Sequence, residues 1–249
     1  PPLLRDVVET FDADTGQFTK FTENINGTMM LTGGQVTISN NAGAARNDLI
    51  VVGSAPTAPQ VFVSIDIVTR SGSPSGYDNI GVGLIKDSNN FVLASVDRLA
   101  AEVRLQIKIG GTNNFYVGVS RAIGPGQKLG FALVGNVATI YVHDGASWRY
   151  VTGRDISDRI AFKTAGMAGW RGGFVVATPG GSASWTFDNL IVGRFGGVGI
   201  RDLSVVTDEV GQPHIVGGKV YALATCVDGL GTGYQAVIRV PVNAPYGIE

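Results

Sequence analysis

The stretch that most constrains the fold is residues 78–109, where apolar and polar side chains alternate. Three runs with a period of two, at 80–85, 91–96 and 103–109, are separated by polar residues. Alternation of this kind is typical of half-buried β-strands. The polar loop at 86–90 favours a hairpin, because Asn and Asp tolerate a positive φ. We therefore predict three consecutive antiparallel strands in the middle of a sheet that needs a second layer.

The rest of the chain repeats this pattern of short apolar runs between turn residues. No amphipathic helix of three turns is expected; a single helical turn is expected near 156–158. Strands at regular spacing predict an all-β, two-layer antiparallel sandwich over residues 5–197, with helix below about 10%. The further strands are expected at 7–11, 28–31, 35–39, 49–52, 60–69, 115–120, 128–134, 137–142, 148–151, 166–171, 174–177 and 184–192.

Composition narrows the function classes. The chain has 249 residues, of which 36 are Gly, and a formal net charge of −1. A charge so close to zero argues against nucleic-acid binding, which needs a basic patch. No apolar run of about 18 residues is present, so no membrane partner is expected. The first five residues do not resemble a signal peptide and read like the inside of a longer or trimmed chain. Cys226 stands alone and is expected to be a buried, inert thiol.

Four segments in this order, at 8–12, 81–96, 139–145 and 185–192, resemble the concanavalin A-like jelly roll of lectins, laminin-G modules and family 16 glucanases. The resemblance implies two curved antiparallel sheets, with glycan bound on the concave face. It also implies a structural Ca²⁺ near the first and last strands, where Asp12 and Asp188 would be the ligands. The alternative is that Asp12 starts a turn and Asp188 caps one.

The glucanase branch of this family does not fit. Those enzymes carry two carboxylates on the same face of one strand, and retaining glycosidases place the pair about 5–5.5 Å apart. No such spacing occurs here, and Asp66 is the lone acidic residue of its strand. The sandwich is therefore expected not to be an enzyme.

Residues 198–249 differ in character from the sandwich. Three apolar runs with tight turns predict a β-meander that resembles one blade of a β-propeller. The segment 201–206 resembles the first-blade entry of five-bladed glycosidases, in which Asp202 would be the catalytic base, although Leu203 stands where that family has Pro. The alternative is an extra hairpin docked on the sandwich. Docking would cover the apolar residues Val205, Val220, Leu223, Val237 and Ile238.

Four residues are candidates for a sugar-binding platform: Trp148, Tyr150, Trp170 and Arg171. Aromatic faces stack on sugar CH groups, and Arg supplies hydrogen-bond donors in a fixed fork. The alternative is that the Trp residues belong to the core. His143 and His214 are too far apart in sequence for a zinc site or a catalytic triad and are expected in surface turns.

Two functions from different classes remain open. The first is a non-catalytic carbohydrate-binding or structural module of an extracellular or virion protein, which contacts host-wall glycans and other modules of its assembly. Low charge, abundant Gly and a single Cys resemble the minor tail proteins of phages. The second is the accessory sandwich of a glycoside hydrolase, whose five-bladed propeller would be truncated here, with Asp202 as its first catalytic residue.

Overall fold

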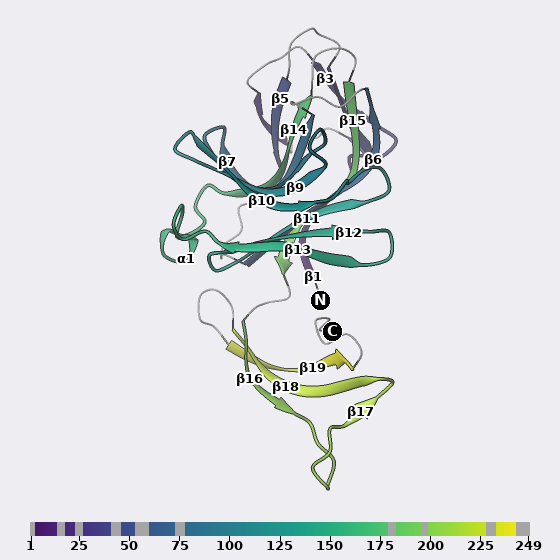
Figure 1. Ribbon diagram of the computed structural model, residues 1–249, viewed down its shortest axis with the longest axis vertical. Coiled ribbons are helices and arrows are strands. Elements are labelled where there is room, and N and C mark those ends of the chain that lie inside the picture. The colour runs from purple at the N-terminus through teal and green to yellow at the C-terminus, as the bar shows by residue number, and fades with distance from the viewer. Residues whose placement is uncertain are drawn as a thin grey trace.

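The computed structural model describes residues 3–13, 18–22, 27–40, 46–52, 60–72, 78–178, 183–195, 199–227 and 233–242. Two antiparallel sheets, A and B, pack face to face as a β-sandwich, and a smaller sheet C follows beyond one end of it (Figure 1). The predicted all-β sandwich is confirmed.

Sheet A holds eight strands, and its two ends come from distant parts of the chain. Strand β15 lies near its centre and pairs with three neighbours, β1, β4 and β6. The edge strand at one end is β13. In spatial order the strands are β13 (Trp148–Asp155), β12 (Val137–His143), β11 (Lys128–Val134), β6 (Gln60–Ser71), β15 (Ala183–Phe195), β4 (Gln35–Asn40) and β3 (Gly27–Thr32), with β1 (Leu3–Glu9) also on β15.

Sheet B holds seven strands and contains the three-strand unit predicted from residues 78–109. That unit is confirmed. In sheet A, the strands predicted at 28–31 and 35–39 and at 128–134 and 137–142 form the hairpins β3–β4 and β11–β12. Strand β2 is new, because sequence analysis expected no strand there. In spatial order the strands are β10 (Thr112–Ser120), β9 (Glu102–Ile109), β8 (Asn90–Asp97), β7 (Asn79–Asp87), β14 (Arg171–Thr178), β5 (Arg46–Val52) and β2 (Phe18–Thr22).

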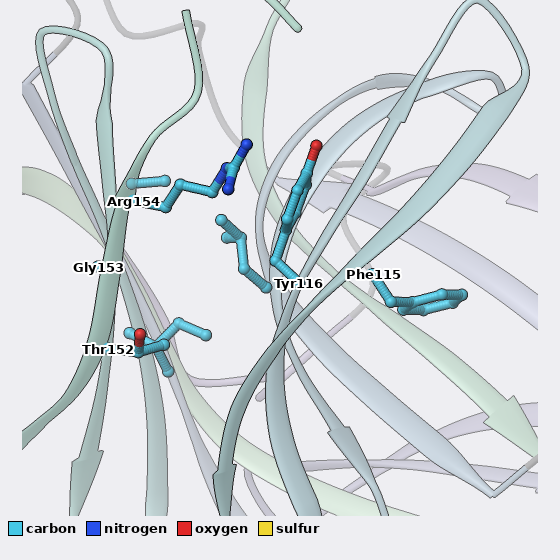
Figure 2. A pocket seen from close by; sticks show the side chains of 8 residues that line it. Phe115, Tyr116, Thr152, Gly153 and Arg154 are labelled. Atoms are coloured by element: carbon cyan, nitrogen blue, oxygen red, sulfur yellow. The ribbon is translucent and has the colours of Figure 1, made fainter. Parts of the chain in front are cut away.

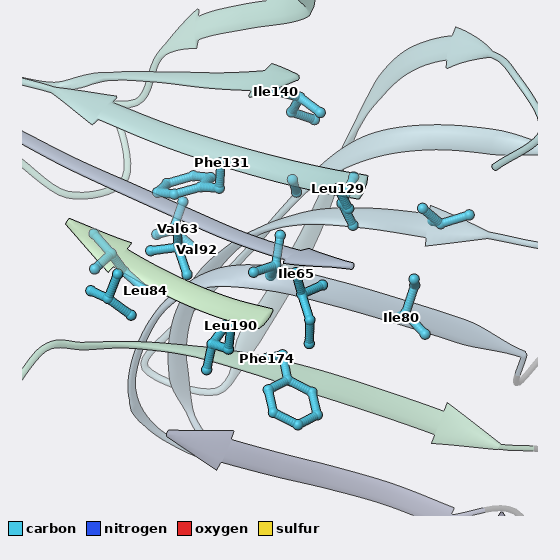
Figure 3. Packing of buried hydrophobic residues seen from close by; sticks show 14 of the residues in the cluster. Val63, Ile65, Ile80, Leu84, Val92, Leu129, Phe131, Ile140, Phe174 and Leu190 are labelled. Atoms are coloured by element: carbon cyan, nitrogen blue, oxygen red, sulfur yellow. The ribbon is translucent and has the colours of Figure 1, made fainter. Parts of the chain in front are cut away.

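The core lies between sheets A and B and follows the alternation of the sequence. On β6, Val63 and Ile65 point into the core, whereas Phe62, Ser64 and Asp66 alternate with them and belong to the outer face of sheet A. Apolar side chains of sheets A and B interdigitate between the two layers (Figure 3). The buried residues of this core include Ile80, Leu84, Val92, Leu129, Phe131, Ile140, Phe174 and Leu190.

The strand predicted at 166–171 is not observed. Residues 166–170 form turns after a single helical turn, α1 (Phe162–Ala165), and β14 begins only at Arg171. Met167 and Trp170 both reach the core, and the Trp170 indole packs edge-on against Phe162 with ring centroids 4.9 Å apart. A single turn does form where one was expected near 156–158, since the N–H groups of Arg159 and Ile160 both donate to the Ile156 carbonyl at 2.9 Å.

Sheet C is the predicted C-terminal meander. Its central strand β18 pairs with β16 and β17 along one side and with β19 along the other. Of the residues expected to be covered by docking, Val205, Leu223 and Val237 are exposed by 42%, 48% and 59%. Ile238 is buried in a small cluster within sheet C itself. The strands are β16 (Gly199–Val205), β17 (Ile215–Val216), β18 (Lys219–Val227) and β19 (Gly233–Pro241).

No helix among the described ranges is long and apolar enough to cross a membrane.

Candidate functional site

Four aromatic side chains gather on the outer face of sheet A, beside the edge strand β13. We call Phe62, Tyr141, Trp148 and Tyr150 the aromatic face. Strand register places Tyr141 opposite Tyr150 and His143 opposite Trp148. Gly130 makes room for this packing, because a Cβ atom there would lie 2.8 Å from the Trp148 ring and 3.0 Å from the Phe62 ring.

The solvent exposure of the aromatic face increases across the sheet, from Phe62 to Tyr150. Phe62 is buried and meets Trp148 edge-on at 5.3 Å between centroids. Tyr141 and Trp148 are half-buried, whereas Tyr150 is 64% exposed. Burial and the neighbouring Tyr150 phenol raise the pKa of Tyr141 above its ordinary value of 10.0. Tyr150 is thus held at the margin of an apolar surface with its ring open to solvent.

A structured turn fixes the start of β13 and therefore the position of Trp148. The Asp144 carboxylate accepts hydrogen bonds from the backbone N–H groups of Ala146 and Ser147, at 3.0 and 2.9 Å, and from Arg149 Nε at 3.0 Å. These donors hold the pKa of Asp144 well below its ordinary value of 3.8. The turn is a side-chain-capped loop of the kind that Asp favours.

A cleft of about 380 Å³ opens on the other side of β13, where the sandwich edge separates β13 of sheet A from β10 of sheet B. Tyr116 stands on the β10 side and Arg154 on the β13 side, and they face each other across the mouth (Figure 2). Phe115 also lines the cleft, although its ring points away from Tyr116 and Arg154 in Figure 2. The floor is aliphatic, and Thr152 and Gly153 form the β13 wall; the floor residues are Leu105, Ala138 and Ile140.

Two guanidinium groups meet at the mouth of this cleft. Arg154 Cζ lies 3.9 Å from the centroid of the Tyr116 ring, a cation–π contact. Arg159 Nε donates a hydrogen bond of 2.7 Å to the Tyr116 hydroxyl oxygen. The Asp158 carboxylate accepts from Arg154 Nη2 at 3.0 Å and lies 3.6 Å from Arg159 Nε. The charge of Asp155 also interacts with Arg154, so two carboxylates accompany the two guanidinium groups of the mouth.

The four predicted platform residues do not form one site. Trp148 and Tyr150 lie together on β13, whereas Arg171 is an exposed residue at the start of β14 in sheet B. Trp170 is only 4% exposed and belongs to the core, so its ring is not open to a sugar. This corrects the expectation for Trp170, and the physical reason is that α1 places Phe162 against the indole. Glycan binding by the other three residues stays a prediction.

None of the residues that line the cleft was among the predicted site residues. Sequence analysis ended the strand of Trp148 at residue 151, although β13 continues to Asp155 and carries Arg154 into the cleft. Residues 152–155 read Thr-Gly-Arg-Asp and carry no apolar alternation, so the sequence held no signal for the extra length. The pairing of this edge with Tyr116 had no sequence signal, because β10 and β13 belong to different sheets.

The predicted calcium ligands are engaged with the protein. Asp12 Oδ2 accepts a hydrogen bond from Thr10 Oγ1 at 2.6 Å, and the Asp188 carboxylate accepts one from the backbone N–H of Asn189 at 2.7 Å. Asp188 lies opposite Asp66, which forms a 2.6 Å ion pair with Lys128. Ca²⁺ takes six to eight oxygen ligands. Among the described residues no three acidic, His or Cys side chains are grouped to hold a metal.

Asp202 lies in β16, where the pairing with β18 shifts register between Arg201 and Ser204. Its side chain falls outside the part of the chain that the structure describes.

Comparison with known proteins places the fold. No family model and no curated protein sequence matches the chain. Among solved structures, the exoplasmic/lumenal domain of VIP36, bound to Ca²⁺ and Man3GlcNAc, is similar with a TM-score of 0.57 and 10% identity over 81% of this chain and 94% of that one. The carbohydrate recognition domain of Emp47p is similar with a TM-score of 0.51 and 12% identity, over 77% and 96% of the two chains.

A third similar structure is the GH43 protein BlXynB from Bacillus licheniformis, with a TM-score of 0.54 and 15% identity. The match covers 76% of this chain but only 39% of BlXynB. At these identities the likeness concerns the fold alone. Together with the observed topology, it shows that the chain has a lectin-like antiparallel β-sandwich.

Proposed function

We propose that this chain is a glycan-binding module whose ligand lies on the aromatic face beside β13. The observation that carries the proposal is Tyr150, a residue that is 64% exposed next to half-buried Tyr141 and Trp148. Aromatic rings of this kind stack on the CH groups of sugars. The lectin-like fold supports the same proposal, since VIP36 was observed with Man3GlcNAc and Emp47p is described as a carbohydrate recognition domain.

The experiment is a glycan array on the purified chain, followed by calorimetry with the best ligand. The test variant is Tyr150→Ala, and the matched control is Phe115→Ala, an exposed aromatic residue on the outer face of sheet B. We expect the Tyr150 variant alone to lose affinity. Equal loss in both variants, or in neither, would place the ligand elsewhere.

The biological setting is part of this proposal. An extracellular protein or a virion tail is the setting we infer, with wall polysaccharide as the ligand and other modules of the same assembly as partners. The resemblance to minor tail proteins of phages rests on low charge, abundant Gly and a single Cys. Binding of the purified chain to isolated cell walls, lost in Tyr150→Ala, tests this setting.

A second candidate is the accessory sandwich of a glycoside hydrolase. It is favoured by one observation, the similarity of this chain to 39% of the length of BlXynB. Under this alternative, sheet C would be one blade of a propeller and Asp202 a catalytic base. Release of reducing sugar by the chain, abolished in Asp202→Asn, would establish the alternative against the first proposal.

A structural Ca²⁺ held by Asp12 and Asp188 is a separate hypothesis. Its support is the Ca²⁺-bound form of VIP36. A rise of the unfolding temperature with Ca²⁺, absent in Asp188→Asn, would establish it; the same unfolding temperature with Ca²⁺ and with a chelator would remove it.

A further inference from the structure

We propose that the cleft between β10 and β13 binds the carboxylate of an acidic sugar, so that the ligand of this module contains a uronic acid residue. This inference rests on the proposed function, because it names the class of sugar that lies next to the aromatic face. It is carried by the two guanidinium groups at the mouth, by the shape of the cleft and by its continuity with Tyr150.

The guanidinium groups at the mouth have unused donors. Each Arg side chain carries five N–H groups in a planar fork. In the described residues, Arg154 donates to Asp158 and Arg159 donates to the Tyr116 hydroxyl. Stacking on Tyr116 holds the Arg154 plane in place, so its remaining N–H groups are oriented before a ligand arrives. Two such groups match the bidentate geometry of a carboxylate.

The cleft below this mouth suits one sugar ring. A volume of about 380 Å³ lies at the lower end of the usual range for small-molecule sites. Ala138 and Ile140 beneath the cleft are fully buried in the core, so a sugar would meet the polar mouth and the Thr152 hydroxyl group. A neutral sugar could accept from the remaining guanidinium N–H groups only through uncharged oxygens, whereas a carboxylate would form the stronger charge-assisted hydrogen bonds.

Gly153 joins the cleft to the aromatic face. It lines the cleft, and a Cβ atom at this position would lie 3.2 Å from Thr139 Oγ1 and 3.6 Å from Tyr150 Oη. Because Gly153 has no side chain, nothing projects from the strand between the two surfaces there. One glycan can therefore place a sugar against Tyr150 and the next, acidic sugar in the cleft.

Asp158 acts in this arrangement as an internal competitor. Its carboxylate already accepts a hydrogen bond from Arg154 and lies near Arg159, which is the position that a ligand carboxylate would take. The pair is exposed, with 43% of the Arg154 side chain and 47% of the Asp158 side chain accessible, so its own contribution to stability is small. Removing the Asp158 charge should free the donors for the ligand.

The probe is D-galacturonate, compared with D-galactose, and binding is followed by the backbone amide signals of residues 152–154 in NMR titrations at low salt. We expect galacturonate to bind at least about tenfold more tightly than galactose, since hydrogen bonds to charged groups are the stronger ones. Arg154→Gln should remove this preference, and Asp158→Asn should increase it. Lys86→Gln, which removes an exposed positive charge from β7 of sheet B, is the matched control and should change nothing.

Three results would overturn the inference: equal binding of the two sugars, an unchanged preference in Arg154→Gln, or weaker galacturonate binding in Asp158→Asn. The last result would show that the Arg154–Asp158 ion pair has only a structural role at the edge of the sandwich. Failure here is distinguishable from failure of the proposed function. If neutral glycans bind in a manner dependent on Tyr150 but galacturonate has no advantage, only the acidic-sugar inference is lost.

Discussion

The interior of the sandwich contains one cluster of charges whose removal we expect to be costly. Asp78 is fully buried, and its carboxylate accepts hydrogen bonds from Arg70 Nε at 3.0 Å and from Arg70 Nη2 at 2.6 Å. Arg98 Nη1 adds a contact of 3.1 Å, and Trp185 Nε1 donates at 2.9 Å. Since Arg70 and Trp185 belong to sheet A and Asp78 precedes β7 of sheet B, the cluster fastens the two layers together.

Asp78→Ala removes the central acceptor from this cluster. The Arg70 side chain is only 2% exposed, so its charge would stay buried with the Gly72 carbonyl, 2.9 Å away, as one remaining partner. Breaking one half of a buried ion pair costs about 3–5 kcal/mol. That is a large part of the roughly 5–15 kcal/mol that stabilises a typical domain.

The assay is urea unfolding followed by tryptophan fluorescence and circular dichroism. Asp158→Asn is the matched control, because it breaks an exposed pair and should cost less than about 1 kcal/mol. The double variant Asp78→Leu with Arg70→Met should recover much of the loss, since apolar replacements of buried pairs are often neutral. If Asp78→Ala lowers the free energy of unfolding by less than about 1 kcal/mol, the Arg70 charge does not depend on Asp78 in the buried manner described here.

Two further predictions follow from burial and from the turn before β13. Trp170 is buried, so Trp170→Ala should lower the free energy of unfolding by about 3–5 kcal/mol while the glycan affinity of the folded protein stays the same. A variant of unchanged stability that has lost glycan affinity would show instead that Trp170 contacts the sugar. Because the folded pKa of Asp144 is depressed, its stabilisation of the turn is complete above pH 3.8 and is lost as pH falls through the folded pKa. Carboxyl ¹³C NMR should therefore show Asp144 still ionised at pH 3, and a midpoint near 3.8 would contradict the hydrogen bonding described.

Much of the fold was predictable because β-strands leave a local signal. The alternation in β9 specifies which residues face the core, and polar or Gly turns mark where the chain reverses. Strands β7 and β8 were also predicted, although both of their faces are buried. The segment 166–171 misled the same reasoning. Apolar residues at 167 and 170 fit either a twisted strand or a turn, and the choice was made by tertiary contact between Trp170 and Phe162.

The candidate site was predictable only in part. Trp148 and Tyr150 are two residues apart, so a strand places them on one face without any knowledge of the rest of the fold. The cleft beside them depends on the order of strands in two sheets. Tyr116 and Arg154 meet because β10 and β13 are the edges of facing sheets, and no periodicity within either strand encodes that meeting.

The most direct test of the central claim is the affinity of wild-type chain and of Tyr150→Ala for the strongest ligand of the glycan array, measured by calorimetry on protein of matched stability. Aromatic anchors at binding surfaces commonly contribute more than 1 kcal/mol, so we predict a loss of at least about tenfold in Tyr150→Ala. Affinity that is unchanged in this variant would contradict the claim that sugars are bound on the aromatic face of β13.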